Sequence, residues 1–374
     1  MAAQKPFAFD ESGFANVMKK AKAENKPVFY MIYASWCPHC HKMREEVFPD
    51  TRISDLINGN FIAAAQDVEL DAGRALARKF NVALYPTFVV LDSDGELLYG
   101  FSGELKKEDF IKEVNDALDP EKQLPYLRKA FANEPSDGNR SLALILAMRK
   151  SAQPASDVAK RYLATQNDEQ LISALNWKII ANGLTDIGSR EFQHVIAHQK
   201  EFASVASEKR VARKIENAVS ETLKPLAERA DSASYNKQRN LIRKFNVRSA
   251  DSLVYVYDKI AYERAKDWTA YRNSTIKATS EFSGKDYTAL RNVAAVYEAQ
   301  LSDEKALMQA VGWATRSLEL QESKEGYFVL SKLYLKLKDN ANAAASARSG
   351  RGFCERVGFG TKEFDEILNR LQSK

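Results

Sequence analysis

The pattern of hydrophobic positions changes near residue 120 of this 374-residue chain. Before that point, short apolar runs rich in β-branched and aromatic residues alternate with segments whose apolar residues recur every three or four positions. The first kind of run predicts buried strands and the second predicts amphipathic helices. From about Leu124 to Leu371 only the helical spacing remains. We therefore expect an α/β domain over residues 1–119 and an all-helical domain over 120–374, with the boundary at Asp119-Pro120.

The α/β part has a regular order of elements. We expect strands at residues 27–34, 61–68, 87–91 and 96–101. We expect helices at residues 12–25, with Ser12 as a cap, and at 38–56, 72–80 and 106–118. The first strand is apolar throughout, which is typical of a central strand covered on both faces. Because a helix is expected to begin at Pro38, the residues between this strand and that helix lie at a strand-to-helix junction.

This junction contains two of the three cysteines, in the order Cys37-Pro38-His39-Cys40. Three cysteines cannot build a disulfide framework, so this spacing indicates a chemical role. At a helix start the first sulfur faces unpaired backbone N–H groups and the positive end of the helix dipole, which favours the thiolate. We expect Cys37 to attack a disulfide and Cys40, one turn inside the helix, to resolve the intermediate.

The sequence from Ala34 to Cys40, which follows a hydrophobic strand, resembles the active-site segment of the thioredoxin-like thiol–disulfide oxidoreductases. Tyr85-Pro86-Thr87 is similar to the cis-proline loop of that family, which offers backbone to an extended substrate. The likeness covers about residues 12–118. It is closer still to the subfamily that includes the C-terminal domain of the bacterial transmembrane disulfide reductase, through Lys26-Pro27-Val28, Lys42-Met43, Glu46-Val47-Phe48 and Asp92-Ser93-Asp94-Gly95.

The resemblance implies a thioredoxin fold, a central mixed sheet flanked by helices, and a role for each residue of the site. Cys37 and Cys40 are the expected catalytic residues. Pro38 and His39 are expected to tune the redox potential. The expected substrate contacts are Trp36, Tyr85 and Pro86. A histidine near the thiolate stabilises the reduced form and favours oxidation of substrates, whereas the rest of the domain is reductase-like. Oxidation, reduction and isomerisation therefore all stay open. No cofactor is expected besides the Cys37–Cys40 disulfide itself.

Two positions depart from the family pattern. Members commonly have a buried carboxylate six residues before the first cysteine, where this chain has Met31. Counting back from Pro86 also puts Asp67 where classical thioredoxins have a lysine. The usual base for the proton of Cys40 is thus missing, with Asp67 or Glu69 as substitutes.

Other kinds of site fit some of the same residues. Cys37 to His41 matches C-x-x-C-H, the attachment sequence of c-type haem. A zinc ion on the two cysteines with His39 or His41 is a second alternative, although no further Cys/His pair completes it. The dithiol is preferred because a buried strand precedes it and a matching proline loop follows, so we predict neither metal nor haem.

Three further residues have chemistry but lie outside any motif. His194 and His198 are four apart on an expected helix and have no carboxylate signature, so we interpret them as surface residues. Cys354 stands alone in the last helices and is expected to be a small buried hydrophobic residue.

The last hundred residues contain a weak internal repeat. Six positions of large and small residues, Leu290, Val293, Ala294, Tyr297, Ala310 and Ala314, correspond to Tyr327, Leu330, Ser331, Tyr334, Ala343 and Ala347. They resemble the tetratricopeptide pattern of paired helices over about residues 286–352, and a plain helical bundle is the alternative. A protein client is the candidate partner of such a surface.

Charge and hydropathy exclude other classes. The net charge is +5, but basic residues are in excess only beyond residue 118, where they are spread over helices, so no nucleic-acid partner is expected. No apolar run reaches the ~18 residues of a membrane span. The CPHC sequence, the family resemblance and an N-terminus that looks processed favour export to a bacterial periplasm, with the cytoplasm as the alternative.

These observations predict an oxidoreductase that acts on protein disulfides and depends on a redox partner protein. The alternative is a helical interaction protein whose dithiol is sensory or vestigial. Insulin reduction compared with Cys37→Ser separates the two.

Overall fold

A computed structural model of the protein describes residues 8–372. The N-terminal residues expected to be a processed start lie outside this range. Contacts within the chain divide it into two compact units, the first ending at Lys214 and the second beginning at Ile215.

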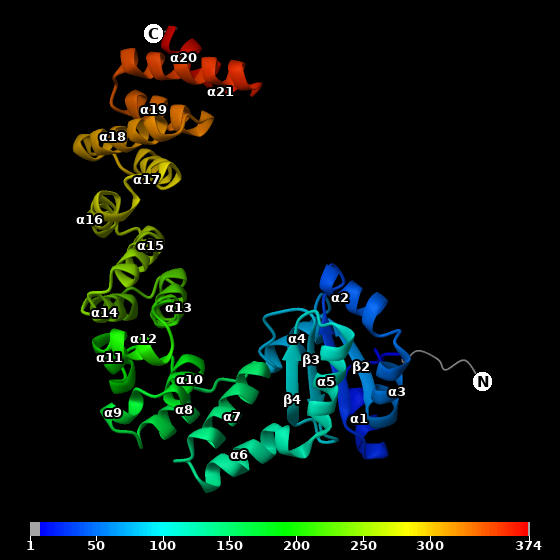
Figure 1. The fold of residues 1–374 in the computed structure, drawn as a ribbon. Coiled ribbons are helices and arrows are strands. Elements are labelled where there is room, and N and C mark those ends of the chain that lie inside the picture. The colour runs from blue at the N-terminus through cyan, green and yellow to red at the C-terminus, as the bar shows by residue number, and fades with distance from the viewer. Residues whose placement is uncertain (1–7, 373–374) are drawn as a thin grey trace. The chain divides into compact units, whose positions relative to one another are not determined.

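The first unit begins with a four-stranded mixed sheet of order β2-β1-β3-β4 (Figure 1). The strands are β1 (Val28–Tyr33), β2 (Ile62–Asp67), β3 (Thr87–Leu91) and β4 (Leu97–Ser102). β1 pairs in parallel with β2 and antiparallel with β3, which pairs antiparallel with β4. The sheet and the helices that flank it confirm the predicted thioredoxin fold, and each predicted strand lies within a residue or so of its expected position.

The helices that accompany the sheet differ from the expectation at one place. They are α1 (Phe14–Glu24), α2 (Pro38–Lys42), α3 (Thr51–Asn60), α4 (Asp71–Lys79) and α5 (Lys107–Leu118). A single helix from Pro38 to about Leu56 is wrong, because a π-helical turn over Met43–Val47 follows α2 and the chain then breaks at Pro49. Asp50 starts α3 anew by accepting a hydrogen bond from the N–H of Arg52. The expected cap Ser12 is also wrong, since α1 begins after Gly13 with no side-chain cap.

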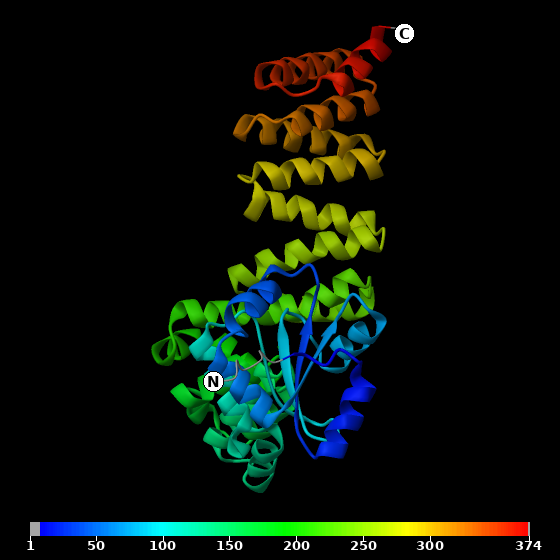
Figure 2. The ribbon, with the colours of Figure 1, turned by 90° about the vertical axis from the view of Figure 1, so that its right-hand side faces the viewer.

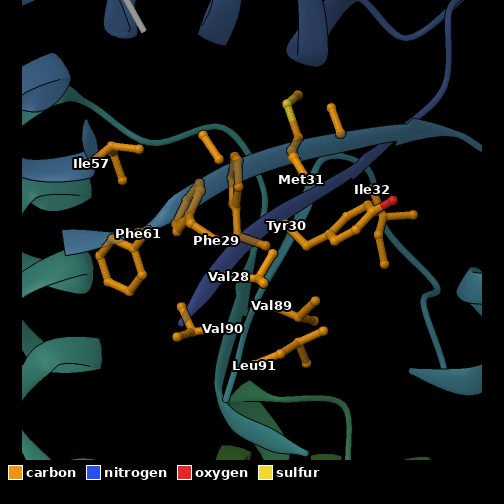
Figure 3. Packing of buried hydrophobic residues seen from close by; sticks show 14 of the residues in the cluster. Val28, Phe29, Tyr30, Met31, Ile32, Ile57, Phe61, Val89, Val90 and Leu91 are labelled. Carbon is orange, nitrogen blue, oxygen red and sulfur yellow. The ribbon is translucent and has the colours of Figure 1, made fainter. Parts of the chain in front are cut away.

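The core of the α/β part lies on both faces of β1. All residues from Val28 to Ile32 are fully or almost fully buried, and Figure 3 shows Phe29 and Tyr30 directed to opposite sides of the strand. On one face Phe29 packs with Phe88 and Phe110 at ring-centroid distances of 5.5 and 5.8 Å. Burial of each such ring contributes about 2 kcal/mol. This packing holds β1 in the core, and the C-terminal end of the strand leads into the dithiol.

Helices follow the sheet within the same unit. They are α6 (Leu124–Asn133), α7 (Gly138–Lys150), α8 (Ser156–Leu163), α9 (Asp168–Leu171), α10 (Ala174–Gly183), α11 (Arg190–Ala197) and α12 (Gln199–Val205). The end of α7 touches β4: a Cβ at Gly100 would lie 3.0 Å from the Cα of Ser151. Lys150 also bonds the Glu113 carboxylate at 2.9 Å and the Tyr99 hydroxyl at 3.0 Å. The domain boundary at Asp119-Pro120 stays a prediction.

The second unit consists of helices throughout its described residues, as predicted. After α13 (Glu208–Glu228), which spans the division between the units, they are α14 (Ser232–Arg243), α15 (Arg248–Arg264), α16 (Trp268–Ala278), α17 (Tyr287–Gln300), α18 (Glu304–Leu320), α19 (Lys324–Lys336), α20 (Asn340–Val357) and α21 (Lys362–Gln372). Figure 2 shows them stacked in succession. No helix within residues 8–372 is long and apolar enough to cross a membrane.

The weak internal repeat falls on α17 to α20. All six positions of its first copy are buried, and in the second copy Leu330, Ser331, Ala343 and Ala347 are buried. The two segments thus place corresponding residues inside. The tetratricopeptide-like assignment stays a prediction.

Candidate active site at the dithiol

The dithiol lies where β1 gives way to α2. The N–H of Cys37 donates to the carbonyl of Ala34 at 3.0 Å, which turns the chain out of the strand. The carbonyl of Cys37 then accepts from the N–H groups of Cys40 and His41 at 3.1 and 3.2 Å. Pro38 is the first helical residue, a position where its missing N–H costs nothing. Cys37 therefore occupies the helix start and Cys40 the first turn.

The structure brings the first sulfur against the proline loop. Both cysteines are free thiols and are buried, with 4% of Cys37 and 2% of Cys40 exposed. The Cys37 thiol donates to the carbonyl oxygen of Tyr85 at 3.7 Å. The next peptide bond, Tyr85–Pro86, is cis. Residues 48 positions apart in the sequence thus meet at one end of the sheet.

The surroundings of Cys40 oppose its ionisation. Burial raises the pKa of the Cys40 thiol to about 12, and the neighbouring Cys37 adds to this, whereas a backbone hydrogen bond from Ala34 and the positive charge of Arg44 lower the pKa. The carboxylate position of the family is occupied by Met31, which is completely buried.

The two expected substitutes for that carboxylate are engaged elsewhere. Asp67, at the end of β2, accepts hydrogen bonds from the N–H groups of Ser35 and Glu69 at 3.3 and 3.0 Å. The carboxylate of Glu69 accepts from the indole N–H of Trp36 at 2.7 Å. Both side chains therefore support the loop before the dithiol. Neither carboxylate has a hydrogen bond to Cys40 among those of the described residues, so the structure does not support either one as its base.

The rings of Trp36, which precedes Cys37, and of Tyr85, which precedes Pro86, contact each other. They form an edge-to-face pair with centroids 6.1 Å apart. Trp36 is 65% exposed although it is a large apolar side chain. Such exposure leaves its face available to a substrate, and the substrate contacts of Trp36, Tyr85 and Pro86 stay predictions.

The redox-tuning candidate His39 has an acidic partner that the sequence did not suggest. Its Nδ1 lies 2.7 Å from a carboxylate oxygen of Glu104, and Lys42 bonds the other oxygen of the same carboxylate. Hydrogen bonds from His39 first and Lys42 second hold the pKa of Glu104 below its usual value. Glu104 follows β4, 65 positions after His39, so no local pattern could have announced the contact.

Arg44 is a second residue that sequence reasoning missed. It follows Cys40 by four positions, a spacing that places two residues on one face of a helix and was visible in the sequence. Its guanidinium lies 4.3 Å from the centroid of the Tyr33 ring and 3.3 Å from the carboxylate of Glu11. Its Nε is buried without a hydrogen-bond partner among the described residues.

The residues of the haem and zinc alternatives bind protein groups. Nε2 of His41 lies 2.7 Å from the carbonyl oxygen of Ser35, and His39 faces Glu104 as described above. Within residues 8–372 no three His, Cys, Asp or Glu side chains gather in a way that could hold a metal ion.

The isolated candidates of the helical part have structural surroundings. The interpretation of His194 and His198 as surface residues is wrong in part, because both are half-buried and their ring centroids lie 4.2 Å apart. Burial, together with the charge of His198, lowers the pKa of His194. Cys354 is completely buried beside Ala347 and Phe364, which confirms it as a small core residue.

A family model described as thioredoxin-like domain matches residues 14–118. This range extends from α1 to the end of α5 and includes the dithiol and the proline loop. The α/β part of the chain is a thioredoxin-like domain.

Two curated relatives each match 76 residues, or 20%, of this chain. Spermatogenesis-associated protein 20 of Rattus norvegicus is 40% identical over its matched residues, and thiol:disulfide interchange protein DsbD of Yersinia pestis is 33% identical over its own. The matches span only 9% and 13% of the lengths of those proteins. Among solved structures, a thioredoxin from Thermus thermophilus is similar at 25% identity and a TM-score of 0.28, covering 30% of this chain and 88% of that one.

Proposed function

We propose that this protein is a thiol–disulfide oxidoreductase that acts on protein disulfides through Cys37 and Cys40. The observation that carries the proposal is the hydrogen bond from the Cys37 thiol to the carbonyl of Tyr85 in front of Pro86. In a thioredoxin-like domain the segment before this proline is the place where an extended substrate pairs its backbone. The contact puts the attacking sulfur next to that place.

The reductive direction proceeds in two exchanges. The Cys37 thiolate attacks one sulfur of a substrate disulfide, whose S–S bond breaks, and the other substrate sulfur leaves with the electron pair and takes up a proton. The Cys40 thiolate then attacks Cys37, which forms the Cys37–Cys40 disulfide and releases the second substrate thiol. Two electrons pass from the dithiol to the substrate, and a reducing partner protein restores the dithiol. The same steps in reverse oxidise a substrate.

The second exchange depends on the unusual surroundings of Cys40. Its thiol is neutral at rest because burial raises the pKa to about 12. With Met31 in place of a carboxylate, the groups that favour its thiolate are the backbone hydrogen bond from Ala34 and the charge of Arg44. We infer that Arg44 assists by electrostatic attraction and that solvent takes the proton.

The pairing of His39 with Glu104 bears on the redox potential. A positive histidine beside the first sulfur stabilises the thiolate and makes the disulfide more oxidising. A carboxylate 2.7 Å from that histidine offsets part of this effect. This contact supports a potential between those of strong oxidants and strong reductants, suited to reduction or interchange.

The export of the protein to a bacterial periplasm is part of the proposal and rests on the CPHC sequence and on the similarity to DsbD of Yersinia pestis. The redox partner would then be a membrane or periplasmic thiol protein. The client, in this proposal, docks on the helices beyond residue 119.

The test is reduction of insulin by dithiothreitol, followed by turbidity, with the full chain as catalyst. The proposal predicts catalysis by the wild-type protein and by Cys354→Ala, which removes the buried third thiol, and none above background by Cys37→Ser. A Cys37→Ser protein that works as well as Cys354→Ala contradicts it and favours a helical interaction protein with a vestigial dithiol.

A further inference from the structure

A cavity of about 570 Å³ opens between α14, α15 and α16 in the second unit. Its lining is rich in cationic and aromatic side chains, among them Arg239, Arg243, Tyr255, Tyr262, Ser274 and Lys277. A volume of this size is typical of ligand-binding pockets. The dithiol chemistry makes no use of this cavity, so its charges need a separate explanation.

A buried ion pair beside the cavity is complete in itself. Asp258 is fully buried, and Arg239 donates two hydrogen bonds to its carboxylate at 2.6 and 2.9 Å. The hydroxyl groups of Tyr235 and Ser274 each donate a further one at 2.7 Å. Four donors use the acceptor capacity of the carboxylate, so Arg239 and Asp258 neutralise each other as a structural pair.

Arg243, one turn further along α14, has donors to spare. It donates one hydrogen bond to the Tyr255 hydroxyl at 3.1 Å, and its guanidinium lies 4.3 Å from the centroid of that ring. The nearest carboxylate oxygens belong to Asp251 and Asp258 at 3.9 and 4.0 Å, too far for hydrogen bonds. Its Nε is buried and has no partner among the described residues. A guanidinium carries five N–H donors, and because the side chain of Arg243 is partly exposed, its terminal amino groups have donors left for an acceptor in the cavity.

The charge of the cavity has the sign that such an acceptor requires. Lys277 is exposed at the cavity and forms no ion pair within the described part of the chain. Three positive side chains, Arg239, Arg243 and Lys277, thus face two negative ones, Asp251 and Asp258, which leaves an excess of one positive charge. A carboxylate fits this excess of one, and its two oxygens match the planar fork of a guanidinium.

We infer that this cavity is a binding site for a carboxylate group presented by an acidic segment of a protein partner. The exposed Asn273 and Lys277 at its edge leave the solvent side open for the chain that carries the carboxylate. The rings of Tyr255 and Tyr262 supply apolar surface for the methylene groups of a glutamate side chain. This inference goes beyond the proposed dithiol function and does not depend on it.

The test uses the full chain and two fluorescein-labelled peptides, one of alternating glycine and glutamate and one in which glutamine replaces every glutamate. Fluorescence anisotropy at low salt is expected to show saturable binding of the glutamate peptide and none of the glutamine peptide. Arg243→Gln should weaken binding about tenfold or more, because it removes charge-assisted hydrogen bonds. Arg243→Lys should give an intermediate value, since it keeps the charge and loses the fork.

The matched control is Lys244→Gln, which removes a positive charge at the neighbouring exposed position outside the cavity lining. Binding that falls equally in Lys244→Gln and Arg243→Gln overturns the inference, as does equal binding of both peptides or no saturable binding. If circular dichroism shows a lower melting temperature for Arg243→Gln than for the wild-type protein, Lys277→Gln replaces it in the same comparison. Free glutarate that competes as well as the peptide would overturn the protein-borne source and assign the carboxylate to a small acid. Insulin reduction measured in parallel keeps failure of this site separate from failure of the dithiol.

Discussion

Two buried ionisable groups, Cys40 in the first unit and Asp258 in the second, are surrounded in opposite ways. In the second unit, Asp258 accepts four hydrogen bonds, two of them from a guanidinium. In the first unit, the groups that favour the Cys40 thiolate are a backbone hydrogen bond and the charge of Arg44. A permanently charged group is stable inside a protein only when it is fully paired. A group that must be neutral at rest and charged during one step needs weaker support.

The comparison separates a structural site from a reactive one on physical grounds. Removing one member of the Arg239–Asp258 pair should change the stability of the protein, because the pair is a permanent part of the folded structure. Changing the support of Cys40 should change a rate, because the thiolate appears only when a mixed disulfide is resolved. The following predictions test this distinction.

The largest effect is expected for Asp258→Asn. It leaves the buried side of Arg239 without its counter-charge and should lower the free energy of unfolding by about 3 kcal/mol. Urea unfolding followed by circular dichroism measures this loss. Glu319→Gln, which removes an exposed partner of Arg316, should cost less than about 1 kcal/mol. If the two variants lose the same free energy of unfolding, the buried pair of Arg239 and Asp258 does not have the structural role assigned to it.

A smaller effect is expected from pH on the resolving step. Because the pKa of the Cys40 thiol is raised to about 12, the thiolate fraction grows with pH throughout the accessible range. Release of thionitrobenzoate from Cys37, after loading with Ellman's reagent in the Cys354→Ala background, should accelerate about tenfold per pH unit. Stopped-flow absorbance measures it. A rate that is constant from about pH 6 to pH 9 would show that another group ionises Cys40 in this range.

The smallest effect is expected for Arg44→Met. Loss of the positive charge should slow the same release about threefold to tenfold at neutral pH and move its pH profile to higher values. The side chain is partly exposed and paired with Glu11, which limits the size of the effect. Arg52→Met, a charge removal on α3, is the control and should leave the profile in place. An unshifted profile in Arg44→Met removes this residue from the account.

The position of the dithiol was predictable because each clue to it is local. The apolar run at residues 27–34 predicted β1, and Cys37 with Pro38 predicted the start of α2. The motif around Pro86 predicted the loop that meets the sulfur. The break between the π-helical turn and α3 was missed although Pro49 and Asp50 announce it, since proline interrupts a helix and aspartate caps the next one.

The charges around the dithiol were not predictable in the same way, because they come from distant segments. Glu104 reaches His39 only through the course of the chain after β4. Asp67 was expected near Cys40 by counting residues, but the fold aims its carboxylate at backbone N–H groups. In the second unit the helical spacing predicted helices, whereas the assembly of Arg239, Asp258 and Ser274 from three of them depends on their packing.

The most direct test of the central claim traps the intermediate in which Cys37 is bonded to a substrate. Cys40→Ser in the Cys354→Ala background is mixed with oxidised insulin or another disulfide protein, quenched with acid and examined by intact mass. The account predicts a covalent adduct through Cys37, released by dithiothreitol and absent when Cys37 is also replaced. Its absence from Cys40→Ser, or an equal adduct in Cys37→Ser with Cys40 intact, would contradict the account.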